Sequence, residues 1–302
     1  MARTLGKIRF VFLLLLLAPA ACRHSQRAAA VPAGPRIVST VPAATQILLQ
    51  IGGGSTLVGV SRFDKPLLPP IYQSLPVVGD YFNLDDELLL NLQPTVLIIQ
   101  KSPLRLAGLP DMARQNHIRL VNVSFNRIRT MEKTVLLLGK LAHRTAAARQ
   151  AVATLQHQLG RYAAELPPRA NRPRVVYLVG TAPMRAVGSD NFIDSVIHLA
   201  GGINIGTQLG SGFPVLTHET LLNLKPQIIL WAMPGAPVAK GSADPRIAEF
   251  LHSAAFASPL PRVFLLTDRL CEMPTLKITD EIKQLRGFFK SLPGSAGGSV
   301  LR

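Results

Sequence analysis

The chain contains the segment Glu87-Leu-Leu-Leu-Asn-Leu-Gln-Pro94 and a second version of it, Glu219-Thr-Leu-Leu-Asn-Leu-Lys-Pro226. The two segments agree at six of eight positions, and each runs directly into an apolar stretch, residues 95–99 and 227–231. The leucines of each segment can bury one face of a short helix, and the proline ends that helix and starts a strand. An internal repeat of this kind indicates two similar lobes.

The repeat also carries an acidic residue at the start of each short helix. Asp85 and Thr217 stand where N-capping side chains are expected, so Glu87 and Glu219 fall in the first turn, where the helix dipole favours a carboxylate. A favourable interaction with the helix dipole could by itself explain why a glutamate stands at each of these positions. Their equivalent placement in the two lobes favours a second, shared role.

Apolar strands alternate with helices on both sides of the repeat. The predicted strands are residues 36–41, 57–60, 95–99 and 118–123, followed in the second lobe by residues 174–179, 227–231 and 262–267. The strands are separated by helical patterns at residues 43–51, 191–200 and 275–292. A further helical pattern lies between the strands 95–99 and 118–123. Continuous apolar strands between helices predict an α/β fold with two Rossmann-like lobes, each with a mostly parallel sheet.

Residues 128–167 interrupt this alternation. No proline occurs from Ile128 to Leu166, and apolar residues recur at helical spacing among His, Arg and Gln. The pattern predicts one long amphipathic helix that bridges the lobes, with the ligand cleft between them. The predicted organisation is an N-terminal lobe over 36–127, this bridging helix, a C-terminal lobe over 172–292 and a disordered tail over 293–302.

The N-terminal residues have the features of an export signal. Basic, then apolar, then small residues follow one another over 1–21, the order of a secretory signal peptide, and a flexible linker follows over 22–35. Ala20-Ala21-Cys22 resembles the end of a lipobox, although Pro19 stands where Leu is preferred. Ala18-Pro19-Ala20 also fits ordinary cleavage, which would release a soluble protein. We favour lipidation of Cys22, which anchors the protein to a membrane.

The composition restricts the partners and the covalent chemistry. The chain has 33 basic and 17 acidic residues, and the basic ones are scattered. Together with export, this argues against nucleic acid and leaves a bias toward anionic partners. The only cysteines are Cys22 and Cys271, so lipidation of Cys22 leaves no disulfide.

Two other classes of protein are less favoured. The seven histidines form no pattern of metal ligands, which disfavours a metal-ion binding protein. No nucleophile elbow, Walker loop, dinucleotide fingerprint or zinc-protease motif occurs, which disfavours an exported enzyme. No cofactor is expected.

Several longer motifs carry a resemblance to a known family. Besides the repeated segments, they are Arg36-Ile-Val-Ser-Thr-Val-Pro-Ala-Ala-Thr45, Leu57-Val-Gly-Val-Ser-Arg-Phe-Asp-Lys-Pro66, Val78-Gly-Asp-Tyr-Phe-Asn83 and Ala200-Gly-Gly-Ile-Asn204. In their order and spacing over residues 35–290, the chain resembles the helical-backbone (class III) periplasmic substrate-binding proteins of vitamin B12 and iron-siderophore ABC importers.

The resemblance implies a function and a partner. It implies an exported monomer that captures cobalamin or another corrinoid and delivers it to an inner-membrane ABC permease dimer. A ferric siderophore or heme is the alternative ligand. The resemblance also implies that Glu87 and Glu219 meet arginines of the permease subunits, one on each.

Side chains that follow the strands, where the lobes meet, are expected to line the cleft. By position these residues are Pro42, Phe63, Tyr81, Phe82 and Gln100 of the first lobe and Arg185, Phe213, Trp231, Asp268 and Arg269 of the second. Aromatic faces would pack against a large ring system, with Tyr81 and Phe82 the strongest candidates. Trp231 could instead be a core residue because it ends an apolar strand. Arg185 and Arg269 could neutralise an anionic siderophore, so the ligand stays open.

Overall fold

The computed structural model describes residues 34–80, 83–100, 108–180, 183–237, 244–254, 256–269, 271–290 and 299–301. The predicted signal peptide, Cys22 and most of the predicted linker lie outside these ranges. In the part of the chain that the structure describes, no helix combines the length and apolar character needed to cross a membrane.

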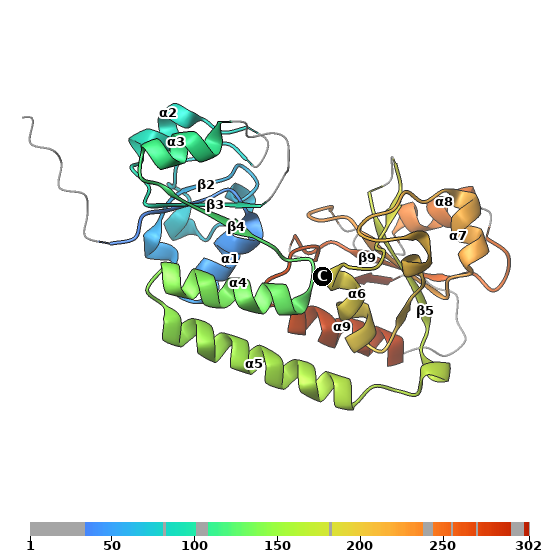
Figure 1. Cartoon of the computed structure of the whole chain (residues 1–302). Helices are drawn as coiled ribbons and strands as arrows, with labels where there is room; N and C mark the ends of the chain where they lie inside the picture. Colours follow the sequence, from blue (N-terminus) through green and yellow to red (C-terminus); the bar gives the residue numbers. More distant parts are fainter. Residues whose placement is uncertain are drawn as a thin grey trace, which may run out of the picture. The chain divides into compact units, whose positions relative to one another are not determined.

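A parallel sheet of four strands organises the first half of the described chain (Figure 1). The strand order is β2-β1-β3-β4, with β1 (Ile37–Ser39), β2 (Leu57–Val60), β3 (Val96–Gln100) and β4 (Arg119–Val123). The helices of this half are α1 (Pro42–Gln50), α2 (Asp86–Asn91) and α3 (Leu109–Gln115). The four predicted strands are therefore confirmed, with ends that differ by at most two residues.

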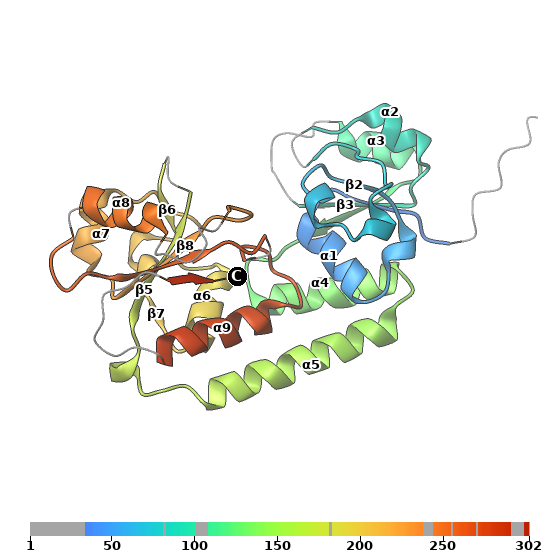
Figure 2. The same cartoon turned by 180° about the vertical axis from the view of Figure 1, so that it is seen from behind.

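A second sheet organises the other half (Figure 2). Its order is β10-β9-β8-β5-β6, and its strands are β5 (Arg174–Val179), β6 (Arg185–Ala186), β7 (Ile203–Asn204), β8 (Ile228–Ala232), β9 (Arg262–Leu266) and β10 (Ser299–Leu301). Strand β7 pairs with β5, and only the pairing of β6 with β5 is antiparallel among the described strands. The helices are α6 (Phe192–Leu199), α7 (His218–Leu224), α8 (Pro245–Ser253) and α9 (Ile278–Lys290). Residues 299–301 form a strand where the sequence predicted disorder, and residues 293–298 lie outside the described residues.

The predicted single helix over residues 128–167 is two helices. Helices α4 (Ile128–Leu141) and α5 (Thr145–Ala164) lie side by side, and the chain reverses through His143, whose φ of 54° is left-handed. A methyl group at Gly139 would collide with Cβ of Ala148, so this glycine lets the two helices approach closely. Helix α5 also contacts α6 and α9, and is therefore the helix that joins the two halves.

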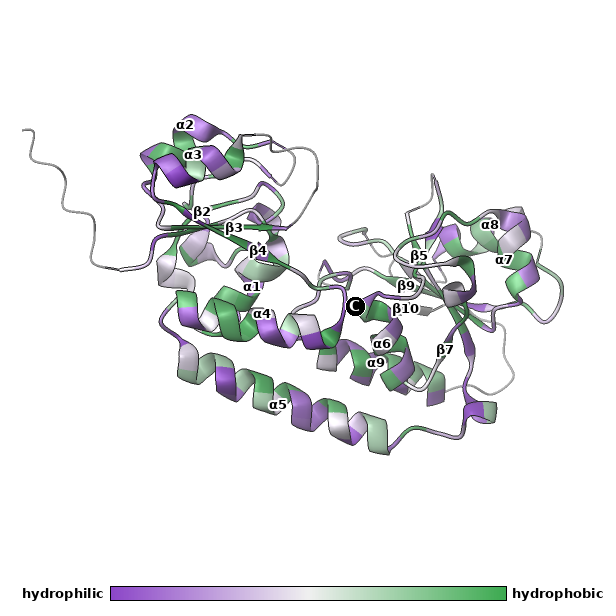
Figure 3. Ribbon diagram, in the orientation of Figure 1, coloured by the Kyte–Doolittle hydropathy of each residue, from purple (hydrophilic) through white to green (hydrophobic). Residues whose placement is uncertain are grey.

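One core runs through both sheets on the side of α4 and α5. It contains Ile98 of β3, Val135 of α4, Val152 of α5 and Tyr177 of β5. Figure 3 shows hydrophobic and hydrophilic residues alternating along α5, as expected for a helix with one face on this core. Separate clusters fill the opposite faces, under α2 and α3 in the first half and under α7 and α8 in the second.

Buried Arg286 of α9 ties the joining helix to the second half. Its guanidinium pairs with the carboxylate of Glu165 at 2.9 Å and donates to the carbonyl oxygens of Tyr162 and Leu199, each at 3.0 Å. The cation is thus satisfied by groups at the ends of α5 and α6, as a buried charge requires.

The two predicted N-caps are present. The Asp85 carboxylate accepts a hydrogen bond from the Leu88 N–H at 2.9 Å, and the Thr217 hydroxyl accepts one from the Thr220 N–H at 3.1 Å. These contacts fix the first turns of α2 and α7. Both sequence assignments are therefore confirmed.

Candidate ligand-binding cleft

A cavity of about 790 Å³ lies between side chains of the two halves. One wall comes from the end of β3 and from the residues that follow β1, β2 and β4. The other comes from the start of α6, from Gly212 and Phe213, and from the loops that follow β8 and β9. These are the carboxyl ends of parallel strands, where α/β proteins bind ligands. The volume falls within the range of about 300–1,000 Å³ that is usual for small-molecule sites.

Five of the predicted cleft residues line this cavity. They are Pro42, Phe63, Gln100, Phe213 and Arg269. Pro42 occupies the first turn of α1, and Gln100 is the last residue of β3. The remaining three lie on loops. The topology thus brings together residues that are far apart in the sequence.

The other predicted cleft residues have different positions. Tyr81 and Phe82 lie outside the described residues. Arg185 does not line the cavity, and its guanidinium instead donates to the carbonyl oxygen of Phe213 at 2.9 Å. Asp268 lines a smaller, neighbouring cavity.

Trp231 is a core residue and not part of the main cavity. Side chains alternate along β8, and this position faces α8, where the indole packs on Phe250 with ring centroids 4.9 Å apart. Only 6% of Trp231 is exposed. Trp231 is absent from the lining of the main cavity, but it lines a smaller hollow that shares Pro234 and Glu272 with that cavity.

Two exposed phenylalanines stand on opposite walls of the cavity. Phe63 is 42% exposed and Phe213 is 43% exposed, although both are large apolar side chains. The Arg62 guanidinium lies 5.2 Å from the centre of the Phe63 ring, and Arg62 in turn pairs with buried Asp80. The Arg185 contact supports the loop of Phe213. Both rings are thus held at the cavity surface, available to a ligand.

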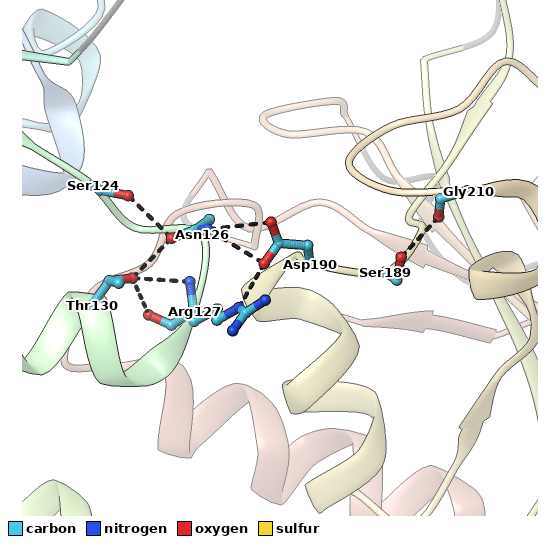
Figure 4. Close-up of polar contacts among 7 residues, drawn as sticks. All are labelled: Ser124, Asn126, Arg127, Thr130, Ser189, Asp190 and Gly210. Carbon is cyan, nitrogen blue, oxygen red and sulfur yellow. Dashed lines mark hydrogen bonds and ion pairs between the residues drawn. The ribbon is translucent and has the colours of Figure 1, made fainter.

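A polar network crosses between the two walls (Figure 4). The Asp190 carboxylate accepts hydrogen bonds from Arg127 Nε at 2.6 Å and from Asn126 Nδ2 at 3.4 Å. The Asn126 side-chain oxygen accepts from the hydroxyls of Ser124 and Thr130. This network was not predicted from the sequence, because its contacts between the walls join Asp190 to residues 63 and 64 positions away, a distance over which no local pattern extends.

The segment after β9 forms the floor of the cavity. Arg269, Glu272 and Met273 line it. The Arg269 guanidinium packs on Gly235, where a Cβ would lie 2.8 Å from Cζ, so the arginine requires a glycine at this place. Burial raises the pKa of the Glu272 carboxyl. Glu272 and Met273 were not predicted from the sequence, because no helix or strand pattern covers this segment.

A smaller cavity of about 190 Å³ adjoins this segment. Asp268, Cys271, Met273 and Glu281 line it, and Met273 also lines the main cavity. Burial, and then the charges of Asp268 and Glu272, raise the pKa of Glu281 to about 8. Within the described part of the chain, no three His, Cys, Asp or Glu side chains are grouped in a way that could bind a metal ion.

Replacement of Glu281 by glutamine is expected to stabilise the protein at alkaline pH. The folded protein raises the pKa of this carboxyl from 4.5 to about 8, so its contribution to stability is complete below pH 4.5 and is lost as the pH rises to about 8. The variant has no carboxyl to ionise at this position. At pH 9 its free energy of unfolding should therefore exceed that of the wild type by about 2–4 kcal/mol. Urea unfolding between pH 5 and 9 measures the difference.

The control for this experiment is Glu249→Gln, which removes an exposed carboxylate from α8. Its stability profile should run parallel to that of the wild type. If the free energy of unfolding of Glu281→Gln changed with pH in the same way as that of the wild type over pH 5–9, the raised pKa of Glu281 would be contradicted.

The two repeated glutamates are both exposed. Glu87 lies in the first turn of α2 and Glu219 in the first turn of α7. No ion pair formed among the described residues includes either of them. Both carboxylates are therefore accessible to another molecule.

Known proteins resemble this chain along most of its length. The cobalamin-binding protein of Halobacterium salinarum is 25% identical over 205 residues, which cover 65% of this chain and 53% of that protein. The match thus spans about half the length of that relative. The vitamin B12-binding protein of Salmonella typhimurium is 24% identical over 244 residues, which cover 79% of this chain and 90% of the relative.

Solved structures share the fold. The periplasmic heme-binding protein of Vibrio cholerae aligns with a TM-score of 0.70 at 21% identity, over 84% of this chain and 98% of that one. The periplasmic vitamin B12-binding protein of Vibrio cholerae aligns with a TM-score of 0.65 at 22% identity, over 84% and 96%. The predicted two-lobed α/β architecture is thereby confirmed.

The family profile described as periplasmic binding protein matches residues 37–276, a range that contains both sheets except β10. The members of this family bind a solute and are not enzymes. The chain belongs to the periplasmic binding proteins.

Proposed function

We propose that this protein captures a corrinoid such as cobalamin and delivers it to an inner-membrane ABC importer. The observation that carries the proposal is the cavity of about 790 Å³ with Phe63 and Phe213 on its opposite walls. Two exposed aromatic rings favour a ligand with a large ring system, which can bury both of them. The names of the curated relatives agree with this ligand.

The charges around the cavity favour a ligand with little net charge. Arg62 is paired with Asp80, and Asp190 is paired with Arg127. The remaining charged residues of the lining are Arg269 and Glu272, one of each sign. A corrinoid carries neutral carboxamides around its ring and a single phosphodiester, which suits such a balanced site better than a polyanion does.

Heme or a ferric siderophore is the second candidate ligand. Arg269 favours it, because a guanidinium on the cavity floor can bind a carboxylate. The fold alone does not distinguish the two classes, since heme-binding and vitamin B12-binding proteins share it.

Delivery requires contact with the importer. As a periplasmic binding protein, the chain is exported across the cytoplasmic membrane. Glu87 and Glu219 are exposed on corresponding helices of the two halves, and a dimeric permease would present one basic site to each. A lipid on Cys22 would keep the protein near the importer as a monomer.

A thermal-shift screen tests the choice of ligand. A ligand that binds only the folded protein raises its stability by about 2.7 kcal/mol at 100 times Kd. We expect cyanocobalamin to raise the Tm of the mature protein, and hemin and a panel of ferric siderophores to raise it less. A shift with hemin or a siderophore and none with cyanocobalamin would transfer the assignment to the second candidate.

A further inference from the structure

Asp190 forms a polar link between the two walls of the main cavity (Figure 4). Its carboxylate accepts hydrogen bonds from Arg127 Nε at 2.6 Å and from Asn126 Nδ2 at 3.4 Å. Asn126 and Arg127 lie between β4 and α4, and Asp190 lies just before α6. Asn126 and Asp190 also line the cavity. The link therefore joins the first half of the chain to the second half at the ligand site itself.

The end of this link in the first half is fixed to helix α4. The Ser124 hydroxyl donates to the side-chain oxygen of Asn126 at 3.0 Å. Arg127 is the N-cap residue of α4, and its backbone N–H donates to the Thr130 hydroxyl at 3.0 Å. Because these contacts are local, they hold Asn126 and Arg127 in place independently of the second half.

The end of the link in the second half is connected to the loop that carries Phe213. The N–H of Ser189 donates to the carbonyl oxygen of Gly210 at 2.8 Å, and the Ser189 hydroxyl donates to the same oxygen at 3.2 Å. The N–H of Gly212 donates back to the carbonyl oxygen of Ser189 at 2.8 Å. Asp190 directly follows Ser189, and Phe213 directly follows Gly212. Asp190 and Phe213 thus belong to one hydrogen-bonded unit.

The link is too weak to hold the two halves together. The Arg127 and Asp190 side chains are 67% and 43% exposed, and an exposed ion pair shifts an equilibrium by only about 1.4- to fivefold. One hydrophobic core already runs through both halves. The ion pair therefore acts locally, on the loop that it joins to the first half.

We propose that Asp190 is a positioning residue for the ligand, because its ion pair with Arg127 holds the loop of Phe213 and orders the exposed ring before a ligand binds. This inference rests on the proposed function, in which Phe213 contacts the ring ligand. Immobilising a free side chain on binding weakens affinity by about two- to 10-fold, and a ring that is already ordered avoids part of this loss. The affinity of the cavity thus depends on Arg127, which does not itself line it.

Asp190→Asn tests this role with little change of shape. Asp190 has a left-handed φ of 56°, which asparagine also adopts readily, so the variant keeps the backbone conformation and loses the charge. Calorimetry on the protein expressed from its full chain should give a Kd for cyanocobalamin about three- to fivefold higher than that of the wild type. Arg127→Gln should raise Kd by a similar factor, and the double variant should raise it no further.

A second comparison separates positioning from direct contact with the ligand. In a Phe213→Ala background, Asp190→Asn should change Kd by less than about 1.5-fold, because the ring that it positions is absent. The difference in Kd between the wild type and Asp190→Asn should also shrink as the salt concentration rises from about 0.1 M to 1 M, since salt screens an exposed ion pair. If the effect of Asp190→Asn persisted without Phe213, the carboxylate would contact the ligand itself and the positioning role would be refuted.

The matched control is Asp111→Asn, which removes the same charge from an exposed ion pair with Arg114 on α3, outside the cavity lining. Its Kd should equal that of the wild type, and thermal unfolding verifies that each variant is folded. If the wild type binds cyanocobalamin and Asp190→Asn changes Kd by less than about twofold, the role of Asp190 is refuted alone.

A different ligand would separate the two proposals further. If the wild type binds hemin or a ferric siderophore and not cyanocobalamin, the corrinoid assignment is refuted, and the Kd values of the same variants for that ligand decide the role of Asp190. If the wild type binds none of these ligands, the proposed function and the role of Asp190 are refuted together.

Discussion

Replacing Glu87 and Glu219 together by lysine is expected to abolish delivery of the ligand to the importer without changing the affinity for the ligand. Both carboxylates are exposed in the first turns of α2 and α7, and neither residue lines the cavity. Loss of one partner of a charge pair at an interface costs about 2–5 kcal/mol, so reversal at both sites should weaken docking by more than roughly 100-fold. Ligand-dependent ATPase activity of the reconstituted importer measures the effect.

A matched control uses Asp111→Lys with Glu249→Lys. These acidic residues are also exposed, one in each half, and the pair changes the net charge by the same amount. The control should retain full stimulation of the importer. Loss of a carboxylate from a first turn costs only about 0.3–1 kcal/mol of helix stability, so the variants should fold. If the Glu87 and Glu219 variant stimulated the ATPase activity of the importer fully, these residues would not be part of the docking surface.

The second large effect concerns the two phenylalanines of the cavity. Phe63→Ala combined with Phe213→Ala should weaken binding of cyanocobalamin by roughly 100- to 1,000-fold. Each ring is more than 40% exposed, and its burial by a ligand contributes about 1.5–3 kcal/mol. Because neither ring is part of the core, the double variant should unfold close to the wild-type temperature.

Ile71→Ala provides the comparison for the aromatic variant. Ile71 is 78% exposed and does not line the cavity, so its removal should leave the affinity unchanged. A loss of less than about 10-fold in the double phenylalanine variant would contradict the assignment of these rings as the main contacts. The ligand would then depend on other residues of the cleft.

The sequence predicted the elements that local patterns determine. Strands β2 and β5 have the predicted ends, because a short apolar run is a local signal. The capping by Asp85 and Thr217 was predicted for the same reason, since an N-cap acts within three residues. The two-lobed architecture followed from a repeat that is visible without any structure.

Features that depend on the whole fold escaped prediction. The apolar spacing continues from Leu141 to Ala148 because both residues face one core, so it concealed the turn at His143 between α4 and α5. The position of Trp231 depends on which helices cover each face of the second sheet. The Asn126–Asp190 contact depends on which loop of the second half lies opposite Asn126. No periodic pattern contains that information.

The most direct measurement is a calorimetric titration of the mature protein with cyanocobalamin, repeated with the Phe63 and Phe213 double variant. A corrinoid-binding protein should give saturable binding with one ligand per chain, and the variant should lose it. Saturable binding of hemin or a ferric siderophore, with no heat from cyanocobalamin, would contradict the corrinoid assignment and leave a binding protein of the same family with a different ligand.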